Sequence, residues 1–266
     1  MKKTTYVAVI ILAALHVISC SAPKVLTVLT YNMLPRVMEE DDIREYRAVA
    51  GFIDRIHPDI TALQNVDFIS GQADTIDAMS TFKRYAFLES GFTRNVAVNA
   101  HATGVGILTE NPPLRSWAVP LPGDTNDPVA LVHEYSDCII ISVQFPINEQ
   151  DQLASVALMD SIAAIYAPER KPLVVAGSMY FTMDSVPFTE MSRNFMSLNR
   201  PWVPTYPPYS PLLCLDYIWG YTGAGVTYDI LDTSILHPPR ASLHLPVLVR
   251  FGYALPKKKK EDKGGS

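Results

Sequence analysis

The chain alternates short apolar runs with segments in which apolar side chains recur at helical spacing. Residues 25–31 are rich in β-branched and aromatic side chains and predict a first strand. Residues 42–55 predict an amphipathic helix that ends at His57-Pro58, and residues 59–63 predict a second, buried strand. The core therefore begins with a strand, a helix and another strand.

The rest of the chain continues this alternation. Residues 71–81 and 149–166 predict two more helices, and the Pro- and Tyr-rich segment 200–211 predicts an ordered loop. The expected apolar face of the later helix consists of Ala154, Leu158, Ile162 and Ile165. Further strands are predicted over residues 104–108, 128–132, 139–143, 173–176, 215–219, 226–231 and 246–251.

So many strands among a few helices do not suit a doubly wound parallel sheet. Two packed sheets with helices on their outer faces fit better, and the predicted fold class is therefore α/β. The chain has 266 residues, of which 48% are hydrophobic, and it shows no internal repeat and no interdomain linker. This length and composition favour a single domain with one large core.

Both ends of the chain differ from this body. Residues 1–19 combine Lys2 and Lys3, a short apolar run and small residues, which is the pattern of a secretory signal peptide. The apolar run is too short for a permanent membrane span, so we expect the segment to be removed. Residues 256–266 predict a disordered basic tail, although the Lys257–Lys260 run is also compatible with a phosphate or lipid-headgroup patch. The predicted domain is 20–255.

The junction after the signal segment reads Val17-Ile18-Ser19-Cys20-Ser21. This run resembles the bacterial lipobox, in which the cysteine becomes the first mature residue and its thiol is acylated. The resemblance implies that lipidated Cys20 attaches the protein to a membrane of the cell envelope. Ser21 is compatible with the outer membrane, facing the periplasm or the cell surface. The alternative is an ordinary signal peptide with a chance cysteine.

The charge of the expected domain limits the classes of partner that it can bind. The whole chain carries 22 basic and 27 acidic residues, and removing the seven basic and two acidic residues of the two ends leaves 15 basic against 25 acidic. Nucleic-acid binding depends on Lys and Arg neutralising phosphates, so we expect no nucleic-acid partner. The remaining cysteines, Cys138 and Cys214, lie in apolar runs and are predicted to be free core thiols rather than a zinc site.

Six short blocks of sequence cover nearly the whole expected domain. They are Leu29-Thr30-Tyr31-Asn32, residues 60–67, residues 104–108, residues 174–180, Leu215-Asp216-Tyr217-Ile218 and residues 242–247. Their order and spacing resemble those of the signature blocks of the endonuclease/exonuclease/phosphatase family. The resemblance implies a four-layer α/β/β/α sandwich of two packed, mainly antiparallel sheets with outer helices. It also implies a site at one edge of the sheets, where active members hydrolyse phosphate esters with Mg²⁺ or a similar ion.

The same resemblance assigns site positions, and several of them depart from the family pattern. Asn32, Asp216 and His244 match it. The expected metal-binding Glu of the second block is Asn65, and the expected His after Ser142-Val143 is Gln144. The remaining departures are Ser178 for Asp and Tyr180 for Asn in the Gly-Asp-Phe-Asn block, and Leu243 for Asp in the Ser-Asp-His block.

These departures remove the groups that the chemistry needs most. Mg²⁺ prefers hard oxygen ligands and normally takes one or two carboxylates. The resemblance gives Asp216 the role of orienting His244 rather than binding the ion, so no carboxylate remains for a metal. We therefore expect no metal and no other cofactor. Asn32 is also compatible with simple backbone bonding, and Asp216 with His244 is compatible with a buried structural pair.

Two hypotheses about function follow. The first is a membrane-anchored lipoprotein whose endonuclease/exonuclease/phosphatase-like domain is a catalytically inactive pseudoenzyme and acts in binding or assembly, with an unknown protein or small molecule as its ligand. The alternative is a metal-dependent phosphodiesterase or phosphatase with a rearranged active site that uses Mg²⁺. The first is favoured because Leu243 and Tyr180 place bulk and apolar surface where a hydrated ion and a phosphate would lie.

Overall fold

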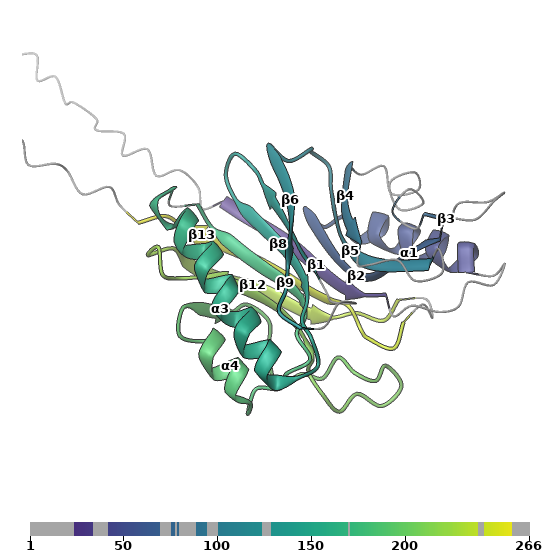
Figure 1. The fold of residues 1–266 in the computed structure, drawn as a ribbon. Coiled ribbons are helices and arrows are strands. Elements are labelled where there is room, and N and C mark those ends of the chain that lie inside the picture. Colours follow the sequence, from purple (N-terminus) through teal and green to yellow (C-terminus); the bar gives the residue numbers. More distant parts are fainter. Residues whose placement is uncertain are drawn as a thin grey trace, which may run out of the picture.

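The computed structural model describes residues 24–33, 42–69, 76–77, 79, 89–94, 101–123, 129–169, 171–238 and 242–256. Within these ranges the chain forms two β-sheets packed against each other, with helices on the outside (Figure 1). The expected signal peptide 1–19, Cys20 and the tail beyond Pro256 lie outside the described residues. No helix in the described ranges is long and apolar enough to cross a membrane.

In the described part of the chain, the first sheet has seven strands. They are β1 (Lys24–Asn32), β2 (Ile60–Ile69), β3 (Ile76–Asp77), β4 (Glu89–Arg94), β5 (His101–Thr109), β12 (Thr227–Ile235) and β13 (Val247–Ala254). Their spatial order is β12-β13-β1-β2-β5-β4, with β3 paired to β2. β1 and β2 are parallel, with Asn32 opposite Gln64, and the other neighbouring strands are antiparallel.

The second sheet has six strands among the described residues. They are β6 (Arg115–Pro120), β7 (Val129–Glu134), β8 (Ile139–Gln144), β9 (Leu173–Ser178), β10 (Phe195–Ser197) and β11 (Asp216–Tyr221). Their spatial order is β10-β11-β9-β8-β7-β6, in which β8 and β9 are parallel and the other pairs are antiparallel. Both sheets are therefore mainly antiparallel, as expected.

Helices cover the outer faces of the sheets. They are α1 (Asp42–Ile56), α3 (Glu149–Tyr166) with the 3-10 turn η1 (Ala167–Glu169), and α4 (Val186–Met191). Val49 and Ile53 of α1 share a buried cluster with Leu29 of β1 and Leu63 of β2. α3 and α4 lie together on the outer face of the second sheet (Figure 1). A further apolar layer fills the space between the sheets, so the four-layer α/β/β/α prediction is confirmed.

The orientation of α3 differs from the sequence prediction although its limits agree. Of the four residues expected to face the core, Ile162 alone is buried, and Ile165 is 72% exposed. Gln152 is buried instead because its amide donates to the carbonyl oxygens of Pro146 and Ile147, both at 3.0 Å. Apolar residues occur on more than one side of this helix, so spacing alone did not decide its face. The buried residues are Gln152, Ser155, Val156, Met159, Ile162, Ala163 and Tyr166.

Several strands escaped prediction. β6 alternates exposed and half-buried positions at the edge of its sheet, and β4 and β10 are similarly edge strands without a strong apolar run. Ile76 and Asp77 form the short strand β3, where the sequence predicted a helix over 71–81; Met79 apart, the rest of that predicted helix lies outside the described residues. The remaining predicted strands are confirmed, with ends that agree within six residues.

β1 connects the two ends of the sandwich. At its start, Lys24 Nζ pairs with Asp137 Oδ2 at 3.2 Å, in the turn between β7 and β8. At its end, Asn32 Nδ2 donates to Ser178 Oγ at 2.8 Å, where β9 ends. We call these the Lys24 end and the Asn32 end. Each contact joins the first sheet to the second, so each end of the sandwich contains residues of both sheets.

Candidate functional site

The candidate site residues lie at the Asn32 end, where several strands end or begin. Asn32 ends β1, and Gln144 and Ser178 end the parallel strands β8 and β9. Asp216 begins β11 directly opposite Ser178. His244 lies shortly before β13 and reaches the same edge. Because parallel strands end at a common edge, side chains that are distant in sequence converge there.

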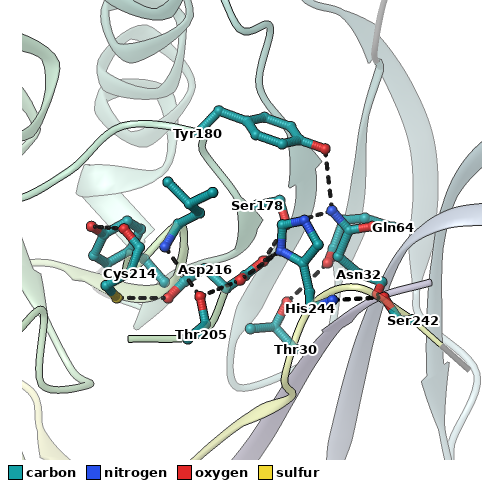
Figure 2. Close-up of polar contacts among 12 residues, drawn as sticks. Thr30, Asn32, Gln64, Ser178, Tyr180, Thr205, Cys214, Asp216, Ser242 and His244 are labelled. Carbon is teal, nitrogen blue, oxygen red and sulfur yellow. Dashed lines mark hydrogen bonds and ion pairs between the residues drawn. The ribbon is translucent and has the colours of Figure 1, made fainter. Parts of the chain in front are cut away.

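Asp216 is the centre of this group (Figure 2). Its carboxylate accepts hydrogen bonds from the hydroxyl groups of Ser178 and Thr205, the latter at 2.5 Å from Oγ1 to Oδ2. It also faces His244, whose Nδ1 lies 2.9 Å from Oδ2 and 3.1 Å from Oδ1. Asp216 is 1% exposed, so these protein groups replace water around a buried carboxylate. We call these residues, together with Asn32, the Asp216 centre.

Asn32 connects the Asp216 centre to the first sheet. Its Oδ1 accepts from Asn65 Nδ2 at 2.7 Å, and its Nδ2 faces Ser178 Oγ at 2.8 Å and Tyr180 OH at 3.3 Å. Its backbone carbonyl accepts from the Ser242 hydroxyl, and Ser242 Oγ accepts from the backbone N–H of His244 at 3.0 Å. The amide of Asn32 is therefore fully engaged with protein groups.

Tyr180 covers this group of side chains. Its ring stands edge-on to the His244 ring at 6.0 Å, and Gln144 Nε2 donates to its hydroxyl at 3.4 Å. Burial raises the pKa of Tyr180, and the nearby Asp216 charge adds to this, while the hydrogen bond from Asn32 opposes it. The phenol is therefore neutral. Tyr206, whose ring lies 5.0 Å from that of His244, packs against the same imidazole.

Local backbone geometry at Asn65 and Gly177 helps to place the side chains of this site. Asn65 has φ of 52° at an irregularity in the pairing of β2 with β5, and Asn is one of the residue types that tolerate this region. The irregularity turns its amide toward Asn32. At Gly177 a Cβ would lie 1.8 Å from the carbonyl oxygen of Val143, so only glycine allows β9 to approach β8 this closely beside Ser178.

Leu243 is the one candidate position that lies outside this hydrogen-bonded group, and it is 38% exposed. The structure thus brings together Asn32, Asn65, Gln144, Ser178, Tyr180, Asp216 and His244. In the ranges that the structure describes, no group of three His, Cys, Asp or Glu side chains is arranged to hold a metal ion.

The sequence from residue 38 to residue 232 matches the Endonuclease/Exonuclease/phosphatase family. The chain belongs to this family. No curated protein matches the chain in sequence. The fold and the position of the candidate residues at one edge of the two sheets therefore have a common explanation in family membership.

Solved structures share this family fold at low sequence identity. An endonuclease/exonuclease/phosphatase from Beutenbergia cavernae has a TM-score of 0.68 and 17% identity, covering 86% of this chain and 71% of that chain. The corresponding protein from Bacteroides vulgatus has a TM-score of 0.69 and 15% identity, covering 88% and 100%. The human Nocturnin catalytic domain, with bound sulfate, has a TM-score of 0.65 and 16% identity, covering 86% and 95%. These similarities show the fold.

Thr205 of this family member is a direct partner of Asp216 that the sequence did not predict. Thr205 lies in the segment expected only to be an ordered loop. Three contacts with the backbone of other residues hold it. Leu215 N–H donates to its Oγ1 at 3.1 Å, Leu245 N–H donates to its carbonyl oxygen at 2.8 Å, and its own N–H donates to the carbonyl oxygen of Leu213 at 2.8 Å. No local sequence pattern predicts that this threonine contacts Asp216, at the start of a later strand.

A second polar layer, also missed, joins the two sheets behind the Asp216 centre. Thr30 Oγ1 donates to Gln64 Oε1, and Gln64 Nε2 donates to Ser142 Oγ, both at 3.2 Å. Ser142 donates in turn to the carbonyl oxygen of Leu63 at 3.2 Å. The three side chains are fully buried, so the core of this family member is polar close to the site.

The two cysteines of the described domain are free and buried, as the sequence predicted. Burial raises the pKa of both Cys138 and Cys214 to about 12. Cys214 Sγ lies 3.6 Å from the carbonyl oxygen of Asp216 and belongs to the packing beneath the Asp216 centre. Neither thiol is suited to act as a nucleophile.

Proposed function

We propose that this family member is a lipid-anchored protein of the bacterial cell envelope whose domain is catalytically inactive and acts in binding or assembly. The observation that carries the proposal is the closed, internally paired Asp216 centre (Figure 2). Its members Asn32, Ser178, Thr205, Asp216 and His244 are each at most 2% exposed. A substrate would have to break hydrogen bonds that these groups already make with one another.

The donor set of the Asp216 centre does not fit a Mg²⁺ ion. Mg²⁺ needs several hard oxygen ligands and gains most from carboxylates. The Asp216 carboxylate already accepts from Ser178, Thr205 and His244, and the neighbouring groups are neutral amides and hydroxyls. A cation would gain a single negative ligand and disrupt the hydrogen bonds around it, which disfavours metal binding.

The arrangement around Tyr180 also disfavours a phosphate. Its hydroxyl occupies the space between Asn32 and Gln144, and both amides contact it. A phosphate ester in this position would lie near the Asp216 charge and would meet no cation other than a protonated His244 within the Asp216 centre. Binding of a substrate anion is therefore unfavourable even before catalysis is considered.

The lipid anchor is supported by the sequence around Cys20, which resembles a lipobox directly after a signal-like segment. Acylation would hold the protein at a membrane of the cell envelope, with the outer membrane as the expected location. The acidic domain, with 15 basic and 25 acidic residues, supports a protein or small-molecule partner rather than a nucleic acid.

One observation favours a second candidate, a phosphodiesterase or phosphatase with a rearranged site. His244 presents Nδ1 to Asp216, which leaves Nε2 oriented as in a general base supported by a carboxylate. The same pair is equally suited to joining β11 to the segment before β13, and the 2% exposure of His244 favours that structural role.

The test compares the purified chain with two variants. Calorimetric titration with Mg²⁺ and Mn²⁺ is combined with turnover of bis(p-nitrophenyl) phosphate and p-nitrophenyl phosphate. We expect no binding of either ion below millimolar concentration and no turnover beyond that of His244→Ala. Micromolar metal binding, together with turnover that His244→Ala abolishes, would show that the second candidate is correct.

A restored variant provides the positive control. The combined substitutions Asn65→Glu, Ser178→Asp, Tyr180→Asn and Leu243→Asp return the family pattern at the four positions assigned to the metal and its surroundings. We expect this variant, if folded by circular dichroism, to bind Mn²⁺ measurably. No gain in a folded variant would mean that these positions do not form the family's metal site.

A further inference from the structure

We infer that the Lys24 end of the sandwich contacts the phospholipid surface and that the Asp216 centre faces away from it. The inference rests on the lipid anchor proposed above. The proposed orientation follows from the path of β1. The first residue of β1 lies at one end of the two sheets and its last residue lies at the other (Figure 1).

The tether between anchor and domain is short. Cys20 and Lys24 are four residues apart, so the chain between them spans at most about 14 Å. β1 has nine residues, and at roughly 3.3 Å per residue Asn32 lies about 26 Å beyond Lys24. An acylated Cys20 therefore keeps the Lys24 end at the bilayer surface, whereas the Asn32 end lies farther away than the tether extends.

Large apolar side chains are exposed around the Lys24 end. They are Val25 (38% exposed), Leu114 (67%) and Leu255 (51%). Leu114 N–H donates to the carbonyl oxygen of Glu134 at 2.8 Å, beside the turn that contacts Lys24, and Leu255 follows Tyr253, which pairs with Lys24. Contact through this end removes all three side chains from water, which stabilises the contact once the tether has brought this end to the bilayer.

The charges at the Lys24 end are compatible with a lipid surface. Three of its carboxylates, Asp137, Glu134 and Glu169, are paired with Lys24 and Lys171 at 2.9–3.2 Å. Of the other two, Asp59 accepts from the backbone N–H of Thr27 at 2.7 Å, and Glu110 faces His57 at 3.4 Å. The domain as a whole is acidic, with 15 basic against 25 acidic residues, so contact with an anionic phospholipid surface depends on this pairing of carboxylates with lysines. The short tether therefore sets the orientation, and the exposed apolar side chains and paired carboxylates of the Lys24 end are compatible with it.

The orientation exposes the Asn32 end to partners from the aqueous side. The hairpin bridged by Tyr206 and Leu213 lies against His244 at this end and carries Tyr209 and Leu212, each 74% exposed. A partner of the Asp216 region would approach this hairpin, on the face of the molecule that points away from the membrane.

Introduced cysteines can measure the orientation. Leu114→Cys and Leu255→Cys place a thiol at the Lys24 end, and Leu212→Cys is the matched control at the Asn32 end. Cys138 and Cys214 are buried and do not compete for a thiol-reactive fluorophore. The acylated full chain is reconstituted into phosphatidylethanolamine–phosphatidylglycerol vesicles that contain a lipid with a spin-labelled headgroup, which quenches nearby fluorophores.

We expect quenching at residues 114 and 255 to be at least threefold stronger than at residue 212. Equal quenching at the three positions, or stronger quenching at residue 212, in a chain that is acylated by mass spectrometry and floats with the vesicles overturns the orientation alone. A chain that lacks the acyl group and stays in solution overturns the anchor and the orientation together, and leaves the inactive Asp216 centre to be judged by metal binding.

Discussion

Two buried carboxylates at opposite ends of the molecule are stabilised in different ways. Asp216, at the Asn32 end, accepts from two neutral hydroxyls and one imidazole. Glu134, at the Lys24 end, pairs with Lys171 at 3.1 Å and with the guanidinium of Arg115. Burial works against ionisation of Glu134, but the hydrogen bonds from Lys171 and Arg115 outweigh it, so its pKa lies below the ordinary value.

The two carboxylates differ in how far water reaches their partners: those of Asp216 are buried, whereas Arg115 beside Glu134 is exposed. Arg115 is 62% exposed along its side chain, so water and ions can replace part of what it gives to Glu134. Thr205 and Ser178 are fully buried, and nothing from solvent can replace them beside Asp216. The position that the family resemblance assigns to catalysis therefore behaves as part of the packed interior, whereas the opposite end behaves as a solvated network.

The largest effect is expected from Asp216→Ala. This change leaves Ser178, Thr205 and His244 buried without their common acceptor, which we expect to lower the free energy of unfolding by about 3–5 kcal/mol. Urea denaturation followed by circular dichroism measures it. Ser178→Ala, which removes one of the donors to Asp216 and one acceptor of Asn32 Nδ2, is the control and should cost about 1–2 kcal/mol. A loss below about 1 kcal/mol for Asp216→Ala would show that the Asp216 centre does not stabilise the fold.

His133 on β7 is a third buried group, and among the described residues it has no charged partner. Its Nδ1 lies 3.0 Å from Tyr135 OH, and its Nε2 has no hydrogen-bond partner in the described part of the chain. Burial lowers its pKa from 6.5 to about 4. The unfolded chain therefore binds a proton more readily than the folded protein between these values.

This pKa shift predicts a pH-dependent stability. As the pH falls from about 6.5 to about 4, the free energy of unfolding should decrease by about 3 kcal/mol on account of His133. The measurement is a series of urea midpoints across this range. In His133→Leu that part of the pH dependence should disappear, and an unchanged slope in the variant would assign it to other groups.

A smaller effect is expected from Glu134→Gln at the Lys24 end. Loss of the carboxylate weakens the pairing with Lys171 and Arg115, and we expect a loss of about 1–2 kcal/mol at low salt. Because Arg115 is largely exposed, the loss should shrink in 1 M NaCl, whereas that of Asp216→Ala should not. Equal salt dependence for the two variants would contradict the distinction between core and surface.

The smallest effect is expected from Leu243→Asp alone. Leu243 is 38% exposed and takes no part in the hydrogen bonds around Asp216, so the stability should change by less than about 0.5 kcal/mol. Thermal unfolding is sufficient to measure it. A loss comparable with that of Ser178→Ala would place Leu243 within the Asp216 centre rather than at its edge.

Sequence patterns predicted most of the fold because its central strands are continuous apolar runs, such as those of β8 and β9. The edge strands β6 and β10 were missed because one face of each meets water, which leaves few apolar positions to recognise. The predicted orientation of α3 was wrong because Gln152 is buried through hydrogen bonds to the carbonyl oxygens of Pro146 and Ile147, just before the helix, and the spacing of apolar residues does not show such polar contacts.

The sequence predicted which residues lie at the candidate site, but it did not predict all of their hydrogen-bond partners. The family blocks placed Asn32, Ser178, Asp216 and His244 at one edge, and the structure brings them into contact. The sequence could not show that Thr205 would complete the shell around Asp216, because that contact depends on the path of the loop after β10. Hydrogen-bond partners depend on which residues are close in space, and residue identity alone does not determine this.

The most direct test of our proposal that the Asp216 centre binds no metal is a crystal of the protein grown or soaked with millimolar MnCl₂ and examined by anomalous diffraction. The account predicts no manganese peak within coordination distance, about 2.0–2.4 Å, of the Asp216 carboxylate or of the side-chain oxygens of Asn32, Asn65 and Ser178. An anomalous peak in that position, with these side chains turned toward it, would contradict the account.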